Sequence, residues 1–333
     1  MKVLHINYKE VRRLLPMEQC IEEMSEVLKT FSDGDVVMPL RSIVWHPDKR
    51  GALGVMPAYL GNPELFGIKI VTVFPGNEGT DYESHQGAVM LFDAEHGRLL
   101  AIIDGGEITT IRTAAVSAVA TRVLARKDAR DLAIIGSGTQ ARSHLQAMAA
   151  VRDLRRIRVW SRNRENAQHF AEWARPIADV EVAQTARGAV EGADIICTVT
   201  GSKEPVIQGE WISPGSHINA VGACVKVARE LDSAAVARSR LFVDCRESAF
   251  NESGDILIPR QEGLFGDDHV RAELGEVLAG RAEGRESDEE VTLFKSLGIA
   301  VEDLAAAHYI YRRAQAENIG LSVELGGLRH GAS

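Results

Sequence analysis

The sequence predicts an α/β protein with two domains, a doubly wound parallel sheet and a discontinuous α+β domain. A strand, a glycine-containing turn and a helix start follow one another at residues 132–150, and strand-like and helix-like segments then alternate as far as residue 200. Several strand-like runs precede this unit, between residues 40 and 104. Alternation is typical of parallel sheets, because a helix must carry the chain back to the start of each new strand.

The turn at residues 136–141 reads Gly-Ser-Gly-Thr-Gln-Ala and follows an apolar run. Gly136 permits the tight turn, Gly138 lets the backbone approach a pyrophosphate, and Ala141 keeps the new helix close to the sheet. Free amides at the helix start would face the phosphates. A strand-to-helix turn without a ligand is the alternative, but the alternating segments that follow favour a nicotinamide or flavin nucleotide site.

The end of the second strand of the unit, at residues 156–161, indicates which nucleotide is bound. An acid there bonds the ribose 2′-hydroxyl of NAD, whereas a cation accommodates the 2′-phosphate of NADP. This chain has Ser161, Arg162 and Asn163 at that point, and no acid before Glu165. We therefore expect NADPH to be preferred, with NADH possible, unless Arg162 is only a solvated surface residue.

Composition excludes several classes of protein. The net charge of -9 and the lack of a basic run argue against a nucleic-acid surface. No segment has the apolar length of a signal peptide or a membrane span, so a cytoplasmic protein without a membrane partner is expected. The four cysteines form no Cys-x-x-Cys pair, and no paired histidine spacing indicates a metal.

The α+β domain is expected to use both ends of the chain. Apolar residues at helical spacing occupy residues 8–31, with a break near Pro16, and a last helix is expected at 301–318, after a strand at 291–297. Strands are predicted at 40–45, 52–56, 67–74, 87–92 and 99–104. The predicted boundaries are 1–120 with 301–333 for the α+β domain, and 121–300 for the Rossmann domain.

Two cations of the first domain stand out. Strand alternation places Lys69 on one face with Val71 and Val73, either at the sheet rim, which the sequence favours, or in a cleft. Desolvation in a cleft would lower its pKa, and a substrate anion would raise it. Arg112 and Thr113 open an alanine-rich helical run, from which Arg112 could reach a carboxylate or a phosphate.

Twelve stretches, in order over nearly the whole chain, resemble the ornithine cyclodeaminase/mu-crystallin family, and its mu-crystallin (ketimine reductase) branch more closely. They include the glycine turn, Met38-Pro-Leu-Arg41, Gly54-Val-Met-Pro57 and His217-Ile-Asn-Ala-Val-Gly222. The others lie at residues 69–71, 91–93, 104–106, 112–120, 229–232, 252–255, 273–277 and 294–298.

This resemblance implies a homodimer whose first domain supplies the interface and the substrate pocket. It implies that Arg41, Lys69 and Arg112 bind the substrate, with Met56, His85 and Cys224 near the pocket. Together with the glycine turn and the residues after the second strand, it gives these expected cofactor contacts: Arg112, Thr113, Gly136, Gly138, Thr139, Gln140, Ser161, Arg162, Asn163, Thr198, Val199, Thr200, Val221, Gly222 and Leu297.

The implied chemistry is reduction of the C=N bond of a small anionic imino acid, such as a cyclic ketimine or iminosuccinate. Three converging cations suit a carboxylate. Arg41 and Arg112 would clamp it, which sets the hydride distance and the attacked face. Lys69 would polarise or protonate the substrate, since neighbouring cations lower the pKa of a lysine.

Two departures from the family pattern argue against a cyclodeaminase. Cys224 stands where cyclodeaminases and archaeal alanine dehydrogenases have an aspartate, and Gly54 stands where cyclodeaminases have an acid. Cys224 is expected to pack, because hydride transfer requires no nucleophile. His85 is either a pocket or relay residue or an ordinary loop histidine, and His217 is expected to be structural. Glu252 and Asp255 either approach the substrate or cap a helix.

Other functions stay open at this stage. An alanine-type amino-acid dehydrogenase would run the same chemistry in reverse, and a cyclodeaminase-like lyase ranks below it. An NADP-dependent binding protein is the main alternative outside enzymes. The set of Arg41, Lys69 and Arg112 favours the enzyme, because a carrier need not keep a carboxylate clamp.

Overall fold

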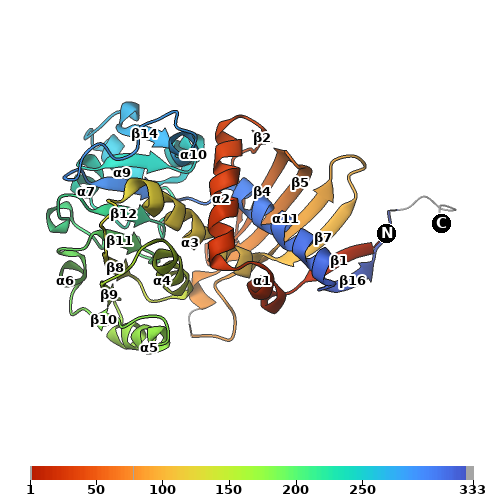
Figure 1. The fold of residues 1–333 in the computed structure, drawn as a ribbon, viewed down its shortest axis with the longest axis horizontal. Helices are drawn as coiled ribbons and strands as arrows, with labels where there is room; N and C mark the ends of the chain where they lie inside the picture. Colours follow the sequence, from red (N-terminus) through yellow and green to blue (C-terminus); the bar gives the residue numbers. More distant parts are fainter. Residues whose placement is uncertain (1, 78, 328–333) are drawn as a thin grey trace. The chain divides into compact units, whose positions relative to one another are not determined.

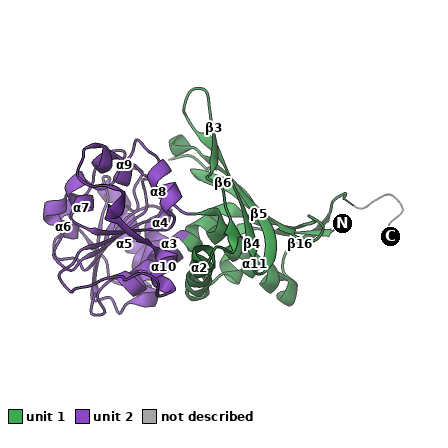
Figure 2. Ribbon diagram, turned by 90° about the horizontal axis from the view of Figure 1, so that it is seen from above, with its two compact units in different colours: residues 1–112, 299–333 green, residues 113–298 purple. Residues whose placement is uncertain are grey.

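The computed structural model describes residues 2–77 and 79–327, and the chain divides into two compact units (Figure 2). Unit 1 comprises residues 1–112 and 299–333, and unit 2 comprises residues 113–298. The chain passes from unit 1 to unit 2 after Arg112, inside helix α3 (Gly105–Leu124), and the predicted boundary after residue 120 lies later in the same helix. Residues 328–333 of the predicted first domain lie outside the described residues.

Unit 1 is built on a sheet with the strand order β16-β1-β7-β6-β5-β4-β2, in which β3 also pairs with β4. The five predicted strands are present, and β4 extends well beyond its predicted end because it pairs with β5 along its whole length. Three short strands, β1, β2 and β16, were not expected. The strands are β1 (Lys2–Ile6), β2 (Val36–Val37), β3 (Ser42–Trp45), β4 (Ala52–Gly61), β5 (Glu64–Val73), β6 (His85–Asp93), β7 (Leu99–Asp104) and β16 (Leu321–Glu324).

Three helices of unit 1 are α1 (Tyr8–Leu14), α2 (Met17–Ser32) and α11 (Ala300–Glu317), and the predicted break at Pro16 separates the first two. Helix α11 packs on α2 and on β4, β5 and β6 (Figure 1). It crosses β5 closely at Gly67, where an added Cβ would lie 2.4 Å from Leu304 Cδ1. This close approach places the first turn of α11 over the middle of the sheet.

The other face of this sheet, here the outer face, is apolar but not fully buried. Cross-strand pairing puts Val44, Leu53, Tyr59, Phe66, Ile68, Met90 and Phe92 on it. Val44 is 64% exposed and Phe66 is 48% exposed. A half-exposed apolar sheet face of this kind is typical of an interaction surface.

Unit 2 contains a second sheet, in the order β10-β9-β8-β11-β12-β15-β13-β14. Every pair of neighbouring strands is parallel, which confirms the doubly wound parallel class. The strands are β8 (Asp131–Ile135), β9 (Arg156–Trp160), β10 (Glu181–Val182), β11 (Ile195–Thr198), β12 (His217–Ala220), β13 (Arg240–Val243), β14 (Val270–Glu273) and β15 (Thr292–Lys295).

The α-helices of unit 2, besides the last turns of α3, are α4 (Thr139–Val151), α5 (Arg164–Ala174), α6 (Ala186–Val190), α7 (Ser233–Ala237), α8 (Arg246–Glu252), α9 (Gly254–Gln261) and α10 (Leu274–Leu278). Strand β8 has β9 and β10 on one side and β11 and the later strands on the other, so the strand order reverses there. Ligands of such sheets bind outside the carboxyl ends of the strands where the order reverses. Here that point lies beyond the ends of β8 and β11.

Candidate active site

The glycine turn after β8 has the geometry that a dinucleotide requires. Gly136 has φ +122°, and an added Cβ would lie 2.7 Å from the Val199 carbonyl oxygen, so only glycine fits. Gly138 precedes α4, and a Cβ added there would meet no atom within 4 Å. The start of α4 has no side-chain cap, and Ala141 is fully buried against the sheet. Open space above uncapped helix amides fits a pyrophosphate.

A buried carboxylate that we did not predict ties together the two neighbouring loops. Glu230 Oε1 accepts a hydrogen bond of 2.6 Å from the Thr200 amide, and Oε2 accepts bonds from the Gly222 amide at 2.7 Å and the Thr198 hydroxyl at 2.8 Å. Burial raises the pKa of Glu230, although Lys295 opposes this shift. The carboxylate therefore joins the carboxyl ends of β11 and β12, where the predicted cofactor contacts Thr198, Val199, Thr200, Val221 and Gly222 lie.

A second buried carboxylate holds the segment that follows β15. Asp244, just after β13, accepts hydrogen bonds on Oδ2 from the amides of Leu297 at 2.6 Å and Gly298 at 2.7 Å. Leu297 is thus held in place through its amide by the Asp244 side chain. The sequence carried a signal for Asp244, because it borders the apolar run 241–243, where an unpaired charge is costly. Glu230 stands in a charged stretch, which gave no such signal.

The residues expected to select the nucleotide are divided between two roles. The side chain of Asn163 caps α5 by accepting a 2.9 Å hydrogen bond from the Glu165 amide, so it has a structural task. Arg162 is exposed, and Ser161 is half-buried.

The other predicted cofactor contacts near the glycine turn differ in exposure. The backbone carbonyl of Gln140 accepts a 2.8 Å hydrogen bond from the buried His144 ring. Thr139 is exposed, whereas Thr113 is buried.

Cys224 and Asp255 have structural roles in unit 2. Cys224 is half-buried, packs against the apolar core, and donates a 3.3 Å hydrogen bond to the Val221 carbonyl. Asp255 lies in the first turn of α9, and its carboxylate bonds elsewhere. It is buried, accepts bonds from the amides of Glu230 and Leu231, and pairs with the buried Lys295 at 3.0 Å. Glu252 is the last residue of α8, and Ser253 is the N-cap residue of α9.

Unit 1 brings together the predicted cations around an acid that we did not predict. Lys69 lies on β5 opposite Met56 of β4 and Val89 of β6, and all three are buried. With 4% of its surface exposed, Lys69 is not at the sheet rim, so that expectation was wrong. Its Nζ lies 3.1 Å and 3.2 Å from the two carboxylate oxygens of Asp303. This partner on α11 is what allows the charge to be buried.

Arg112 shares the same acid. Its Nε donates to Asp303 Oδ1 at 2.9 Å, and its Nη1 donates to Glu302 Oε2 at 2.7 Å. Because α3 begins at Gly105, Arg112 lies within the helix rather than at its start, which corrects the predicted position. Arg112 does reach carboxylates, but they come from α11. The predicted cluster of bare cations is therefore a mixed network of cations and carboxylates.

The charges of this network set its proton affinities. Burial, Arg112 and Arg41 lower the pKa of Lys69 to about 8, while Asp303 opposes them. Burial would raise the pKa of Asp303, but Arg112 and Lys69 together hold it below its ordinary value. Lys69 is therefore a cation that can lose its proton close to neutral pH, beside a carboxylate that stays ionised.

Arg41 and His85 lie around this network. Arg41 is half-buried, and its charge acts on Lys69. His85 is exposed, its Nδ1 lies 2.9 Å from the Ser84 hydroxyl, and partial desolvation together with Lys69 lowers its pKa. His85 is therefore neutral at pH 7, which suits a hydrogen-bonding residue more than an anion-binding one.

Sequence reasoning missed Glu302 and Asp303. A signal existed, because Asp303 precedes Ala307 by four residues on the apolar stripe of the last helix, and an acid on such a stripe needs a buried partner. The pattern does not say which cation is that partner. Only the packing of α11 on β5 identifies Lys69.

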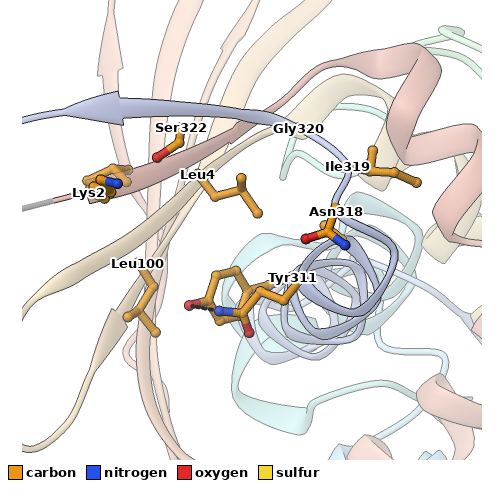
Figure 3. A pocket seen from close by; sticks show the side chains of 11 residues that line it. Lys2, Leu4, Leu100, Tyr311, Asn318, Ile319, Gly320 and Ser322 are labelled. Carbon is orange, nitrogen blue, oxygen red and sulfur yellow. Dashed lines mark hydrogen bonds between the residues drawn. The ribbon is translucent and has the colours of Figure 1, made fainter.

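A cavity of about 440 Å³ lies elsewhere in unit 1, near the end of α11 (Figure 3). Its lining includes Lys2, Leu100, Tyr311 and Asn318, and the Tyr311 hydroxyl accepts a 2.8 Å hydrogen bond from Gln315. Asp303 belongs to the opposite end of the helix. Lys2 is the one charged residue of this lining, so the cavity offers no acid-base pair for the predicted reaction.

His217 is a buried histidine of unit 2. Its ring lies 3.0 Å from the Thr292 hydroxyl and 3.2 Å from the Asn219 side-chain oxygen, as expected of a structural histidine.

Among residues 2–77 and 79–327, no group of three or more His, Cys, Asp and Glu side chains could hold a metal ion. Over the same residues, no helix has both the length and the apolar character that crossing a bilayer requires.

Known proteins resemble this chain over almost all of its length. It is 45% identical to the ketimine reductase mu-crystallin of Mus musculus over 294 residues, 87% of this chain and 90% of the relative. The structure of Thermococcus litoralis Δ(1)-pyrroline-2-carboxylate reductase with NADH and L-proline matches with a TM-score of 0.94 and 39% identity, covering 96% of this chain and all of that one.

An archaeal alanine dehydrogenase dimer with bound NAD matches with a TM-score of 0.92 and 32% identity, covering 98% of this chain and 100% of that one. The model of the ornithine cyclodeaminase/mu-crystallin family matches residues 2–318. The predicted resemblance is thereby confirmed, and the chain belongs to the ornithine cyclodeaminase/mu-crystallin family.

Proposed function

We propose that this protein reduces the C=N bond of a small imino acid to the amino acid, using NADPH or NADH. The observation that carries the proposal is the buried network of Lys69, Arg112 and Asp303 in unit 1, in a chain whose unit 2 has a complete dinucleotide turn. Relatives named as ketimine reductase and Δ(1)-pyrroline-2-carboxylate reductase support the same reaction.

The side chains of unit 1 have distinct tasks in this reaction. The bound reduced nicotinamide supplies the hydride for the imine carbon. Arg41 and Arg112 bind the substrate carboxylate, because guanidinium groups have several donors and Arg112 can keep its bonds to α11 while donating to a ligand. Lys69 holds or donates the proton at the imine nitrogen. An ammonium has three N–H groups, so Lys69 can bond Asp303 and a substrate atom together.

The alternatives differ in what they require. A cyclodeaminase needs acids at positions 54 and 224, and this chain has Gly54 and Cys224 there. A pure binding protein does not require a lysine whose pKa lies near 8. An amino-acid dehydrogenase uses the same residues in the reverse direction, and the alanine dehydrogenase relative makes it the second candidate.

Cofactor choice belongs to the same proposal. We favour NADPH over NADH because Arg162 is an exposed cation just after β9, with no acid beside it that could bond a ribose hydroxyl. The turn of Gly136 and Gly138 would hold the pyrophosphate of either nucleotide. Thr198, Thr200 and Gly222, held by Glu230, would border the nicotinamide end.

We also propose a homodimer that covers the outer face of unit 1. The face carries Val44, Leu53, Phe66 and other apolar residues, and a second copy offers the same apolar face in return. The archaeal alanine dehydrogenase relative is described as a dimer, which supports the same assembly.

A spectrophotometric panel tests the reaction. The purified protein is mixed with NADPH or NADH and with pyrroline-2-carboxylate, piperideine-2-carboxylate, iminosuccinate, or pyruvate plus an amine. Oxidation of the nucleotide with at least one of them, abolished by Lys69→Met while NADPH affinity is kept, is the expected result. No oxidation with any substrate would refute the reductase, and full turnover by Lys69→Met would remove Lys69 from the mechanism.

A further inference from the structure

The structure assigns a role to Asp303 that deepens the proposed function: we propose that Asp303 is a positioning residue, which aims Lys69 and keeps it protonated for the proton transfer to the imine nitrogen. The inference rests on the proposed function for the reaction that it serves. The contact between the two side chains does not depend on it. Asp303 itself need not touch the substrate.

Two cations converge on the Asp303 carboxylate. Both oxygens of Asp303 lie within 3.2 Å of Lys69 Nζ, and Oδ1 also accepts the 2.9 Å bond from Arg112. One carboxylate therefore determines where two substrate-binding cations point. A lysine side chain has four rotatable bonds, and such a two-oxygen contact removes much of that freedom before a substrate arrives.

Asp303 lies on a well-packed element. It lies in the first turn of α11, which packs on the sheet at Gly67, where Leu304 leaves no room for a Cβ. Glu302 in the same turn bonds Arg112 and the Ile299 amide. Side chains supported in this way hold functional groups more accurately than loops do.

The charges around Lys69 act in opposite directions on its proton affinity. The groups that face Lys69 are Asp303 on α11, Arg112 on α3, Arg41 before β3 and His85 on β6. Burial and the two arginines favour the neutral amine, and Asp303 opposes them. Without the Asp303 carboxylate, Lys69 would lose its proton at lower pH and could not donate it in neutral solution.

The experiment compares the pH dependence of kcat/KM in the wild type and Asp303→Asn. Asn keeps the size of the side chain but removes its charge. We expect the alkaline limb of the profile to move to lower pH by roughly one to three units, the range for loss of a close opposite charge. Asp303→Glu, which restores the charge, should return the limb toward the wild-type position even if turnover stays low.

Glu302→Gln is the matched control. It removes a neighbouring buried carboxylate that bonds Arg112, so it should raise KM for the imino acid. The alkaline limb should stay in place, because the charge removed is not the one bonded to Lys69. A limb that moves as far in Glu302→Gln as in Asp303→Asn would overturn the specific role of Asp303.

A direct titration separates this inference from the proposed function. The Cε signal of Lys69 in protein labelled with ¹³C-lysine, assigned by its loss in Lys69→Met, is followed against pH in the nucleotide-free protein. A lower Lys69 pKa in Asp303→Asn supports the inference even if no imine is reduced, and an unchanged pKa overturns it even if the reductase is real. If Asp303→Asn does not fold, Asp303→Ser, which also removes the charge, takes its place in the titration, and the same two outcomes decide the inference.

Discussion

Gly138 and Gly201 have similar surroundings in unit 2 but different expected importance. A Cβ added at either one would meet no protein atom within 4 Å, and neither has a positive φ. The space beside Gly138 lies at the start of α4, where the pyrophosphate is expected, whereas Gly201 lies beyond the proposed contacts. The protein itself therefore tolerates alanine at both positions, and only a ligand distinguishes them.

Gly138→Ala should weaken NADPH binding by about tenfold or more, equivalent to roughly 1.4 kcal/mol, with little change in thermal stability. Gly201→Ala should leave both quantities as in the wild type. Fluorescence titration with NADPH and a thermal melt measure them. Equal affinities of the two variants would show that no phosphate approaches Gly138.

Arg162→Ala should weaken NADPH binding by about tenfold to a hundredfold and leave NADH binding almost unchanged, because only the 2′-phosphate needs the cation. Arg175, an exposed arginine just after α5, provides the control substitution Arg175→Ala. The ratio of the two dissociation constants is the measurement. A loss of the same size for both nucleotides would make Arg162 a general surface charge.

At the scale of elements, the carboxyl ends of the strands of unit 2 are joined by acids rather than by apolar contacts alone. Glu230 joins the ends of β11 and β12, and Asp244 holds the segment after β15. Hydrogen bonds from amides to a buried carboxylate are stronger than those between neutral groups. The loops that would contact the nucleotide are thus held in place before it binds.

Glu230→Gln should weaken nucleotide binding about tenfold, because an amide group cannot accept bonds on both of its heavy atoms and one loop amide loses its partner. Hydrogen exchange of the Thr200 and Gly222 amides should become faster in the variant. Titration with NADPH gives the affinity. A lower melting temperature with unchanged affinity and unchanged exchange at these amides would reduce Glu230 to a structural residue.

At the scale of the whole molecule, acid should destabilise unit 2 before it protonates most carboxylates. Burial lowers the pKa of His144 to about 4 and that of His217 to about 3. The unfolded chain takes up these protons near pH 6.5, so the stability contributed by the neutral rings is complete above pH 6.5 and is lost as the pH falls toward 4.

The free energy of unfolding of unit 2, measured in urea, should therefore decrease between pH 7.5 and pH 5. His217→Gln, which can still bond Thr292 and Asn219, should be less stable at pH 7.5 but should show a shallower decrease. An equally steep decrease in this variant would assign the acid sensitivity to other groups.

The proposed assembly is also tested at this scale. Phe66→Glu places a charge on the outer face and should convert the dimer to a monomer in size-exclusion chromatography with light scattering. Ile177→Glu, at a side chain of unit 2 that is 40% exposed against 48% for Phe66, should remain dimeric. A dimeric Phe66→Glu protein would place the interface elsewhere.

The sequence by itself determined the parallel sheet, the glycine turn, strands β3 to β7 of unit 1 and the return of the last helix to the first unit. These features depend on local pattern, since strand alternation, helical spacing and turn glycines act over a few residues. The short strands β1, β2 and β16 escaped prediction because two to five residues show too little alternation.

Only the tertiary structure decided how the charges are paired. Lys69 and Asp303 are 234 residues apart in the chain, and Glu230 can join Thr200 to Gly222 only because β11 and β12 lie side by side. Burial makes an unpaired charge costly, but any of several acids could meet that need. The sequence thus predicted the residue types that the reaction requires, and the packing of α11 on β5 decided which acid Lys69 bonds.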